Sequence, residues 1–247
     1  MKDTSTPLKP AVDPAEAKTI HHIIARQIGS AIVAGELKPG DRVGGEHSQS
    51  RNFGISRPAY REAIRKLLAK GLLETRPKSG SHVAPRRRWN LLDPEVIDWM
   101  FSGSPDPDFV RDLLELRVLI EPAAAALAAA RRSEGQLQEM QEAIDKMIEH
   151  GLQSSLGRDA DRRFHNCMLV ASGNEAFMTL SDSIEAAANW ITLYKHRVVP
   201  YAGDLNDEHR AVLEAIALRD PDLASTRMRN LLEITMARLA ADFSQTP

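Results

Sequence analysis

The amino-acid sequence predicts a mainly α-helical protein, with an N-terminal winged helix-turn-helix followed by a C-terminal antiparallel all-α helical bundle. Three observations support this prediction. Helical apolar spacing near the N-terminus gives way to two short strand-like segments, the spacing is helical throughout from residue 108, and the net charge changes sign between the two regions. We expect a flexible tail over 1–18, the winged helix over 19–88, a linker with a short helix over 89–107, and the bundle over 108–243.

The formal net charge of −2 hides a strong asymmetry along the 247 residues. Residues 1–90 contain 17 Lys and Arg against 8 Asp and Glu, a net of +9, and residues 91–247 contain the other 15 against 26, a net of −11. Surface charge also fluctuates between domains without functional meaning. A difference of this size nevertheless favours a basic module for a polyanion, joined to an acidic module with another task.

Several classes of protein are excluded by composition. Cys167 is the single cysteine, so the chain has no internal disulfide framework and no cysteine cluster for zinc or an iron–sulfur centre. The longest apolar run, Val118–Ala130, is interrupted by Glu121 and Pro122, so we expect no membrane span and no membrane partner. Because the N-terminus lacks the apolar stretch of a secretion signal, we expect a cytoplasmic protein.

The basic half has the element order of a winged helix-turn-helix, namely helix, turn, helix and β-hairpin. Ser56 is a favourable N-cap for the helix after the turn, because its side-chain oxygen can accept a bond from a backbone N–H that has no partner within the helix. Pro77–Gly80 forms the expected hairpin turn. The expected helices are Thr19–Ala34, Glu46–Phe53 and Arg57–Lys70, and the expected strands are Leu72–Arg76 and Ser81–Ala84.

An arginine stripe lies on the second helix of the turn. Arg57, Arg61 and Arg65 recur every four residues, so they share one face of that helix. A charge run is usually a solvated face, but this run falls on the helix that would enter the major groove, where arginine can contact guanine edges and phosphates. Lys78 and the Gly80-Ser81 tip of the wing are expected to reach an adjacent groove or the backbone of the DNA.

The acidic half repeats helical apolar spacing from Asp108 to its end, which predicts the antiparallel bundle. Its expected later helices are Arg158–Ala171, Asn174–Arg197, Leu205–Leu218 and Pro221–Phe243. Asp161 and His165 are spaced i, i+4 on an inward face, and His209 lies in a separate amphipathic helix. Together they can bind a divalent metal, although a core histidine bonded to a nearby carboxylate is the commoner explanation of such a pair.

The stretch Ile55–Ile64, followed by Leu67–Leu73 and Gly80–Val83, resembles the DNA-binding domain of GntR-type bacterial transcription regulators. The resemblance implies that Arg57 and Arg61 contact operator DNA. It adds His47 as a third contact, at a position where the family usually has arginine.

The acidic half resembles the ligand-binding domain of the FadR branch of that family, the FCD domain. The resemblance rests on Leu116–Glu121, Asp161–His165 with Gly173-Asn174, and Glu208-His209. It implies an all-α bundle with a divalent metal held by Asp161, His165, His209 and the residue at Asn230. Because an amide oxygen is a harder donor than imidazole, we expect weaker zinc or nickel binding and more room for manganese or magnesium.

The resemblance also implies a small carboxylate effector beside the metal. Arg117 is the best candidate to bind it, because a buried arginine in a helical core needs an anionic partner. The alternative partner of Arg117 is Glu121, one helical turn further on, and both readings stay open. The segment Trp89–Pro94 further resembles repressors of sugar-acid catabolism of the galactonate type.

The leading hypothesis is therefore a homodimeric, ligand-responsive repressor that is released from double-stranded operator DNA by a sugar acid or similar carboxylate and is associated with the nucleoid when bound. We do not expect an enzyme. The alternative, a metal-dependent enzyme on a helical bundle, lacks the paired Glu-x-x-His motifs, P-loop and nucleophile elbow of known classes. A purely architectural DNA binder does not explain the large acidic half.

Overall fold

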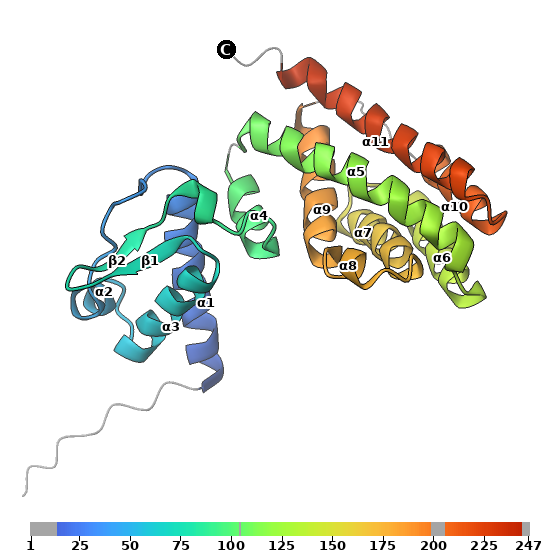
Figure 1. Ribbon diagram of the computed structural model, residues 1–247. Coiled ribbons are helices and arrows are strands. Elements are labelled where there is room, and N and C mark those ends of the chain that lie inside the picture. The colour runs from blue at the N-terminus through green and yellow to red at the C-terminus, as the bar shows by residue number, and fades with distance from the viewer. Residues whose placement is uncertain (1–13, 104, 199–205, 244–247) are drawn as a thin grey trace, which may run out of the picture. The chain divides into compact units, whose positions relative to one another are not determined.

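The structure, a computed structural model, describes residues 14–103, 105–198 and 206–243. The chain divides into two compact units, Met1–Leu91 and Leu92–Pro247 (Figure 1). Within the described residues, the first unit contains a β-hairpin and three α-helices, and the second unit is helical. The predicted mainly α-helical fold class is confirmed.

The first unit has the element order that the sequence predicts. Residues 14–18 are helical rather than part of a tail, because the first helix begins at Pro14, and residues 1–13 of the predicted tail lie outside the described residues. The elements are α1 (Pro14–Val33), α2 (Glu46–Asn52), α3 (Arg57–Ala69), β1 (Leu73–Arg76), β2 (Gly80–Val83) and the 3-10 helix η1 (Arg86–Arg88).

The core of this unit forms where α1 packs against α3. Ile28 and Ile32 on α1 and Ala63 and Leu67 on α3 are buried. Full burial of one large aliphatic side chain contributes roughly 1.5–3 kcal/mol, so these contacts decide which face of α3 turns inward. The opposite face of α3 is left to solvent.

The start of α3 is tied down by hydrogen bonds. The Ser56 hydroxyl accepts a bond from the backbone N–H of Ala59 at 3.3 Å, as the sequence predicts. The hydroxyl of buried Tyr60 donates to the carbonyl oxygen of Gly44 at 2.8 Å, and burial raises the pKa of Tyr60 to about 12. The first bond caps α3, and the second connects the first turn of α3 to the segment that precedes α2.

The β-hairpin forms the wing. Its two strands are antiparallel with Arg76 opposite Gly80, and an isolated bridge joins Arg42 to His82. At the turn, Lys78 and Gly80 have φ values of 60° and 85°, a left-handed backbone that glycine adopts without a Cβ penalty. The turn therefore carries Lys78 and Gly80 at the exposed tip of the wing.

The second unit contains α4 (Pro94–Phe101), α5 (Pro107–Arg131), α6 (Glu134–His150), α7 (Ser155–Ala171), α8 (Glu175–Met178), α9 (Ser181–Val198), α10 (Asn206–Ala217) and α11 (Pro221–Phe243). The expected continuous helix Asn174–Arg197 is divided into α8 and α9. The division follows from a tight turn, in which the Leu180 N–H bonds to the Phe177 carbonyl at 3.0 Å with 3-10 rather than α-helical spacing.

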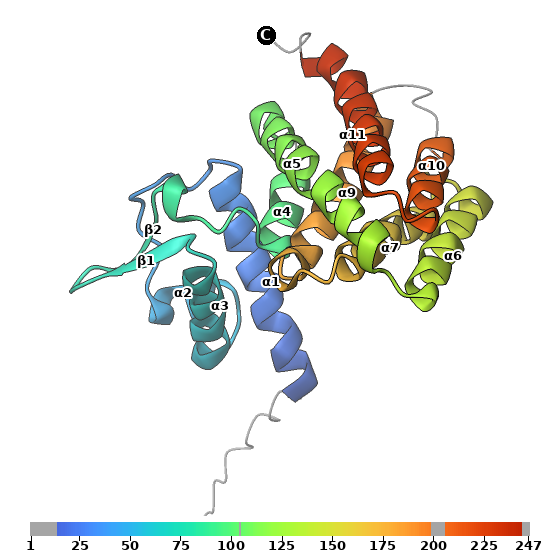
Figure 2. The same ribbon diagram turned by 45° about the vertical axis from the view of Figure 1, so that its right-hand side comes forward.

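The helices of this unit pack in pairs around a continuous apolar core. In Figures 1 and 2, α11 runs along α5 and α6 runs along α7, while α9 packs on α7 and α10 on α11. The short helix α4, expected to lie in a linker, packs against α9. The largest fully buried side chains of the core include Phe164, Met140, Ile144, Met147 and Leu152.

Among the described residues, none of the helices is both long enough and apolar enough to cross a membrane.

Candidate functional site

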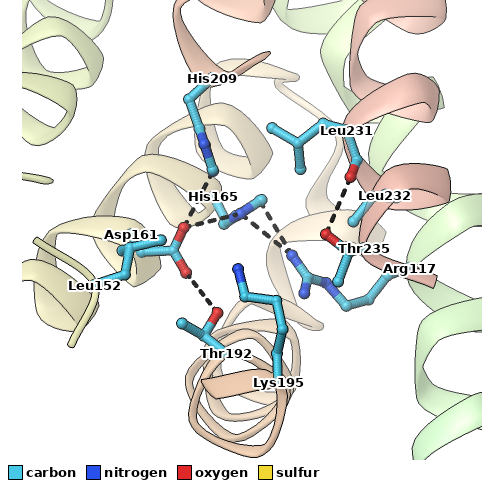
Figure 3. A pocket seen from close by; sticks show the side chains of 10 residues that line it. All are labelled: Arg117, Leu152, Asp161, His165, Thr192, Lys195, His209, Leu231, Leu232 and Thr235. Atoms are coloured by element: carbon cyan, nitrogen blue, oxygen red, sulfur yellow. Dashed lines mark hydrogen bonds and ion pairs between the residues drawn. The ribbon is translucent and has the colours of Figure 1, made fainter. Parts of the chain in front are cut away.

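A polar cavity interrupts the apolar core of the helical unit, where α5, α7, α9, α10 and α11 meet (Figure 3). The cavity has a volume of about 20 Å³, which is room for about one water molecule. It is lined by Arg117, Leu152, Asp161, His165, Thr192, Lys195, His209, Leu231, Leu232 and Thr235.

Three side chains in this cavity offer ligand atoms for a cation. Asp161 and His165 lie one helical turn apart on α7, and His209 approaches from α10. The Nε2 atom of His209 is 3.1 Å from Asp161 Oδ1, and Nε2 of His165 is 3.7 Å from the same oxygen. All three residues are buried, with their ligand atoms within 4.8 Å of one another.

A second carboxylate orients His165. Its Nδ1 atom lies 2.6 Å from Oε2 of the fully buried Glu121. On the other side of the cavity, Thr192 Oγ1 donates to Asp161 Oδ2 at 3.4 Å. These outer contacts engage His165 Nδ1 and Asp161 Oδ2, as supporting residues do around metal ligands, so His165 Nε2 and Asp161 Oδ1 are the candidate ligand atoms.

Arg117 forms the ion pair with Glu121 that was one of its two expected partners, and it also lines the cavity. Its Nε donates to Glu121 Oε1 at 2.5 Å, and its Nη2 lies 3.2 Å from His165 Nε2, so the guanidinium also lines the cavity. The ion pair is almost completely buried, with 4% exposure of Arg117 and none of Glu121. Arg117 therefore brings a positive charge to the site while it neutralises Glu121.

The close charges shift the pKa values of the cluster. Burial raises the pKa of Glu121, but Arg117 and His165 outweigh burial and lower it to about 2. Burial also raises the pKa of Asp161, whereas hydrogen bonds with His165 and His209 hold it well below its ordinary value. For His165, burial lowers the pKa, the charge of Glu121 opposes this, and the result is a pKa of about 9.

The donor set fits a divalent cation with an open coordination position. Two imidazole nitrogens and one carboxylate oxygen suit zinc, nickel or manganese, and three protein ligands leave a position for water or for a ligand oxygen. His165 has to be deprotonated at Nε2 to bind a cation, and the guanidinium of Arg117 has to withdraw from that atom.

The assignment of Asn230 to this cluster is corrected by the structure. Asn230 is exposed on α11 and is not among the residues that line the cavity. Leu231, Leu232 and Thr235 are the α11 residues that line it. Adjacent helical residues differ by about 100° in direction, so the buried leucines at 231 and 232 turn Asn230 away.

Sequence reasoning missed Lys195 and Thr192, which line the cavity from α9. Lys195 is only 2% exposed, so the cavity contains a second cationic side chain besides Arg117. The signal was the helical spacing of Thr192 and Lys195 along the same face as the buried Ala188. A lysine in register with buried apolar residues points inward, and it therefore belongs to a polar site.

A second candidate site lies on the winged helix. The residues of the predicted arginine stripe, Arg57, Arg61 and Arg65, are all exposed on α3, opposite the buried Ala63 and Leu67. The apolar face of α3 is therefore the inward one, and the arginine stripe faces solvent.

Each arginine of the stripe has a partner within the unit. Arg57 contacts Nδ1 of the exposed His47, and Arg65 pairs with Glu62 on its own helix at 3.3 Å. Arg61 is bound by Glu46 of α2 through two hydrogen bonds.

A cavity of about 170 Å³ lies between α3 and the wing. Its lining includes Arg61 together with the wing residues Gly80 and Ser81. The structure thus brings Arg61 and the tip of the wing to one concave surface. Lys78 is exposed at the turn of the hairpin and is not part of this lining.

A winged helix with an exposed arginine stripe, followed by a helical bundle with a buried charged cavity, defines a DNA-binding regulator that responds to a small molecule. The chain belongs to the GntR family of bacterial regulatory proteins. It matches the description "Bacterial regulatory proteins, gntR family" over residues 22–83 and "FCD domain" over residues 112–234.

Curated relatives support the same assignment. The chain is 30% identical over 215 residues to the galactonate operon transcriptional repressor of Escherichia coli (strain K12), covering 86% of this chain and 93% of that protein. It is 31% identical over 192 residues to the HTH-type transcriptional regulator LutR of Bacillus subtilis (strain 168), covering 74% and 84%. These relatives are transcription regulators, so the expectation that the chain is not an enzyme is confirmed.

Among solved structures, the fold is similar to that of Lar, which is described as controlling expression of the Listeria monocytogenes agr system. The TM-score is 0.61 at 20% identity, and the match covers 95% of this chain and 99% of that one.

Proposed function

We propose that the protein is a repressor that binds operator DNA through α3 and the wing, and that leaves the DNA when a small carboxylate binds in the helical unit. The observation that carries the DNA-binding half of this proposal is the exposed stripe of Arg57, Arg61 and Arg65 on α3. Arginine forks match the paired acceptors of guanine in the major groove. Lys78, Gly80 and Ser81 on the wing and His47 beside Arg57 provide further contacts to DNA.

We propose that the effector is a sugar acid or a related small carboxylate. Arg117 and Lys195 are buried cations at the cavity, which is where a carboxylate gains the most from a charged hydrogen bond. The similarity to a galactonate operon repressor agrees with this class of effector. A sugar acid is much larger than a cavity of about 20 Å³. We therefore infer that effector binding separates the helices around the cavity, so that binding changes the conformation of the helical unit.

We propose further that Asp161, His165 and His209 hold a divalent cation, with zinc, nickel and manganese favoured over magnesium by the two imidazoles. Such a cation would supply a positive charge to which the effector carboxylate can bind. The test is elemental analysis of protein loaded with zinc or manganese. Asp161→Asn should lose the metal and His150→Gln, outside the cavity, should keep it; a wild-type protein that retains no metal would contradict the proposal.

A near-palindromic operator needs two winged helices, so we propose a homodimer. Analytical ultracentrifugation of the full-length protein should give twice the mass of one chain. A monomer that binds its operator at one half-site would exclude the homodimer.

The DNA-binding role is tested with operator fragments that the full-length protein selects from a random DNA pool. Arg61→Ala should weaken binding to the selected sequence by about ten- to a hundredfold while the fold is retained. Arg111→Ala, an exposed arginine on α5, is the control and should leave the affinity unchanged. Equal affinities for the two variants would remove the assigned role.

The effector role is tested separately by thermal unfolding and by DNA release. Galactonate should raise the midpoint of unfolding and release the protein from the selected DNA, whereas galactose, which has similar hydroxyls but no carboxylate, should do neither. An equal response to both sugars would exclude recognition of the carboxylate by Arg117 and Lys195.

A further inference from the structure

Glu46 holds the guanidinium of Arg61 from a different helix. Arg61 Nη2 donates to Glu46 Oε1 at 2.8 Å, and Arg61 Nε donates to Glu46 Oε2 at 3.2 Å. Hydrogen bonding with Arg61 lowers the pKa of Glu46, so the carboxylate remains charged. Two parallel bonds fix the plane of the guanidinium as well as its position.

The pair is poorly placed to stabilise the fold. The side chains of Arg61 and Glu46 are 56% and 34% exposed, and solvent screens ion pairs at such positions. The first turn of α3 is already connected to the segment before α2 by the bond from Tyr60 to Gly44. The geometry of the pair therefore acts chiefly on the direction of the Arg61 side chain.

The two bonds occupy one edge of the guanidinium and leave another edge available. Glu46 takes the Nε/Nη2 edge, and no acceptor in the described part of the chain is bonded to the edge between Nη1 and Nη2. That edge presents two parallel N–H groups, which match the neighbouring O6 and N7 acceptors of guanine. Arg61 and Glu46 line the same cavity as Gly80 and Ser81 of the wing.

The other arginines of the stripe are held less firmly. Arg65 makes a single contact with Glu62, three residues earlier on the same helix. Arg57 contacts His47 through one nitrogen. Among the three, Arg61 alone is bound through two nitrogens by a residue of another helix, within the interactions described.

We propose that Glu46 is a positioning residue that sets the sequence specificity of the protein, by directing the Nη1/Nη2 edge of Arg61 at a guanine in the operator. The inference rests on the proposed DNA contact of Arg61. Glu46 has two opposite effects on binding. Its negative charge repels phosphates and so weakens binding to any DNA, while the orientation of Arg61 strengthens binding to the operator.

The two effects give Glu46→Ala a distinctive result. Affinity for the selected operator should fall by about tenfold. Affinity for a scrambled sequence of the same length should rise by about two- to fivefold at the same salt concentration, because a negative charge near the phosphates is gone. Loss of folding would lower both affinities, and a purely electrostatic role would raise both.

Glu62→Ala is the matched control, since it also removes a carboxylate paired with an arginine of the stripe. Both of its affinities should rise, and discrimination between the two DNA sequences should be largely retained. Glu46→Gln, which keeps the side-chain length but holds Arg61 through one acceptor only, should show an intermediate loss of discrimination. Thermal unfolding of each full-length variant checks the fold.

The failure of this inference can be told apart from failure of the Arg61 assignment. If Arg61→Ala leaves operator affinity unchanged, Arg61 is not a contact and both ideas fall. If Arg61→Ala weakens operator binding but Glu46→Ala keeps full discrimination, or raises both affinities, the positioning role of Glu46 is overturned. In the Arg61→Ala background, Glu46→Ala should cause no further loss of discrimination.

Discussion

The buried carboxylates of Glu121 and Asp161 control the protonation of the His165 imidazole. Glu121 engages Nδ1, and the neighbouring negative charges raise the pKa of His165 to about 9 against the cost of burial. A pKa raised above the ordinary value of 6.5 means that protonated His165 stabilises the metal-free fold. This stabilisation is fully present below about pH 6.5 and is lost as the pH rises through about 9.

Metal binding should therefore depend on pH. A cation must displace the proton from His165, so the affinity for zinc or manganese should rise by up to about tenfold per pH unit below pH 9 and then level off. Isothermal titration between about pH 6 and pH 8 in buffers of different ionisation enthalpy measures both the affinity and the proton released.

Two variants control this measurement. His150→Gln removes a histidine outside the cavity and should leave the pH dependence unchanged. His165→Gln should weaken the affinity and flatten its dependence on pH. An affinity for the wild-type protein that does not change with pH would contradict the role of His165 as a ligand.

The buried pair of Arg117 and Glu121 should matter for stability far more than an exposed pair on the same helix. Arg117→Met leaves the carboxylate of Glu121 without its cation, and we expect a loss of about 3 kcal/mol in the free energy of unfolding. Arg111→Met breaks the exposed pair with Asp108 and should cost about 0.5 kcal/mol or less. Urea unfolding measures the free energy of unfolding of each variant. Similar losses in the two variants would mean that protonated His165 alone can neutralise Glu121.

At the scale of single elements, α3 depends on its N-cap. Ser56→Ala removes the acceptor for the Ala59 N–H and should cost about 1 kcal/mol. Hydrogen–deuterium exchange in the first turn of α3 should accelerate accordingly. Ser56→Asp supplies an equivalent acceptor and should restore protection from exchange. Ser48→Ala on α2 is the control and should have little effect. Slow exchange in Ser56→Ala would show that the Tyr60–Gly44 bond is sufficient to hold the first turn of α3.

Element boundaries were predictable where a side chain marks them. The N-cap Ser56 before α3 and the capping-box pair Ser133 and Gln136 before α6 are visible in the sequence, and both caps form in the structure. The division between α8 and α9 has no comparable marker, because it results from a backbone bond between Leu180 and Phe177. Local sequence signals therefore identify ends that are capped by a side chain and do not mark a turn that is closed by backbone groups alone.

At the scale of the whole molecule, the opposite charges of the two halves should be visible in DNA binding. The +9 of residues 1–90 predicts that affinity falls steeply with salt, with a slope of about −0.9 for each phosphate contacted. Lys78→Ala should reduce this slope by about one for each copy of the chain bound. Lys146→Ala removes an exposed lysine of the helical unit and should leave the slope unchanged. Equal slopes for the wild type and both variants would exclude Lys78 as a phosphate contact.

The sequence by itself determined the fold class, the order of the elements and the exposed arginine stripe. These features depend on periodicity, capping residues and charge, which are properties of neighbouring positions along the chain. The pair of Asp161 and His165 was predictable for the same reason, because both lie on one helix face.

Only the tertiary structure decided which side chains share a site. It removed Asn230 from the proposed metal cluster, added Lys195 to the cavity, and placed Glu46 against Arg61. The physical reason is that these relations depend on how one helix is rotated against another. That rotation is set by the packing of the whole core, so no local pattern in the sequence specifies it.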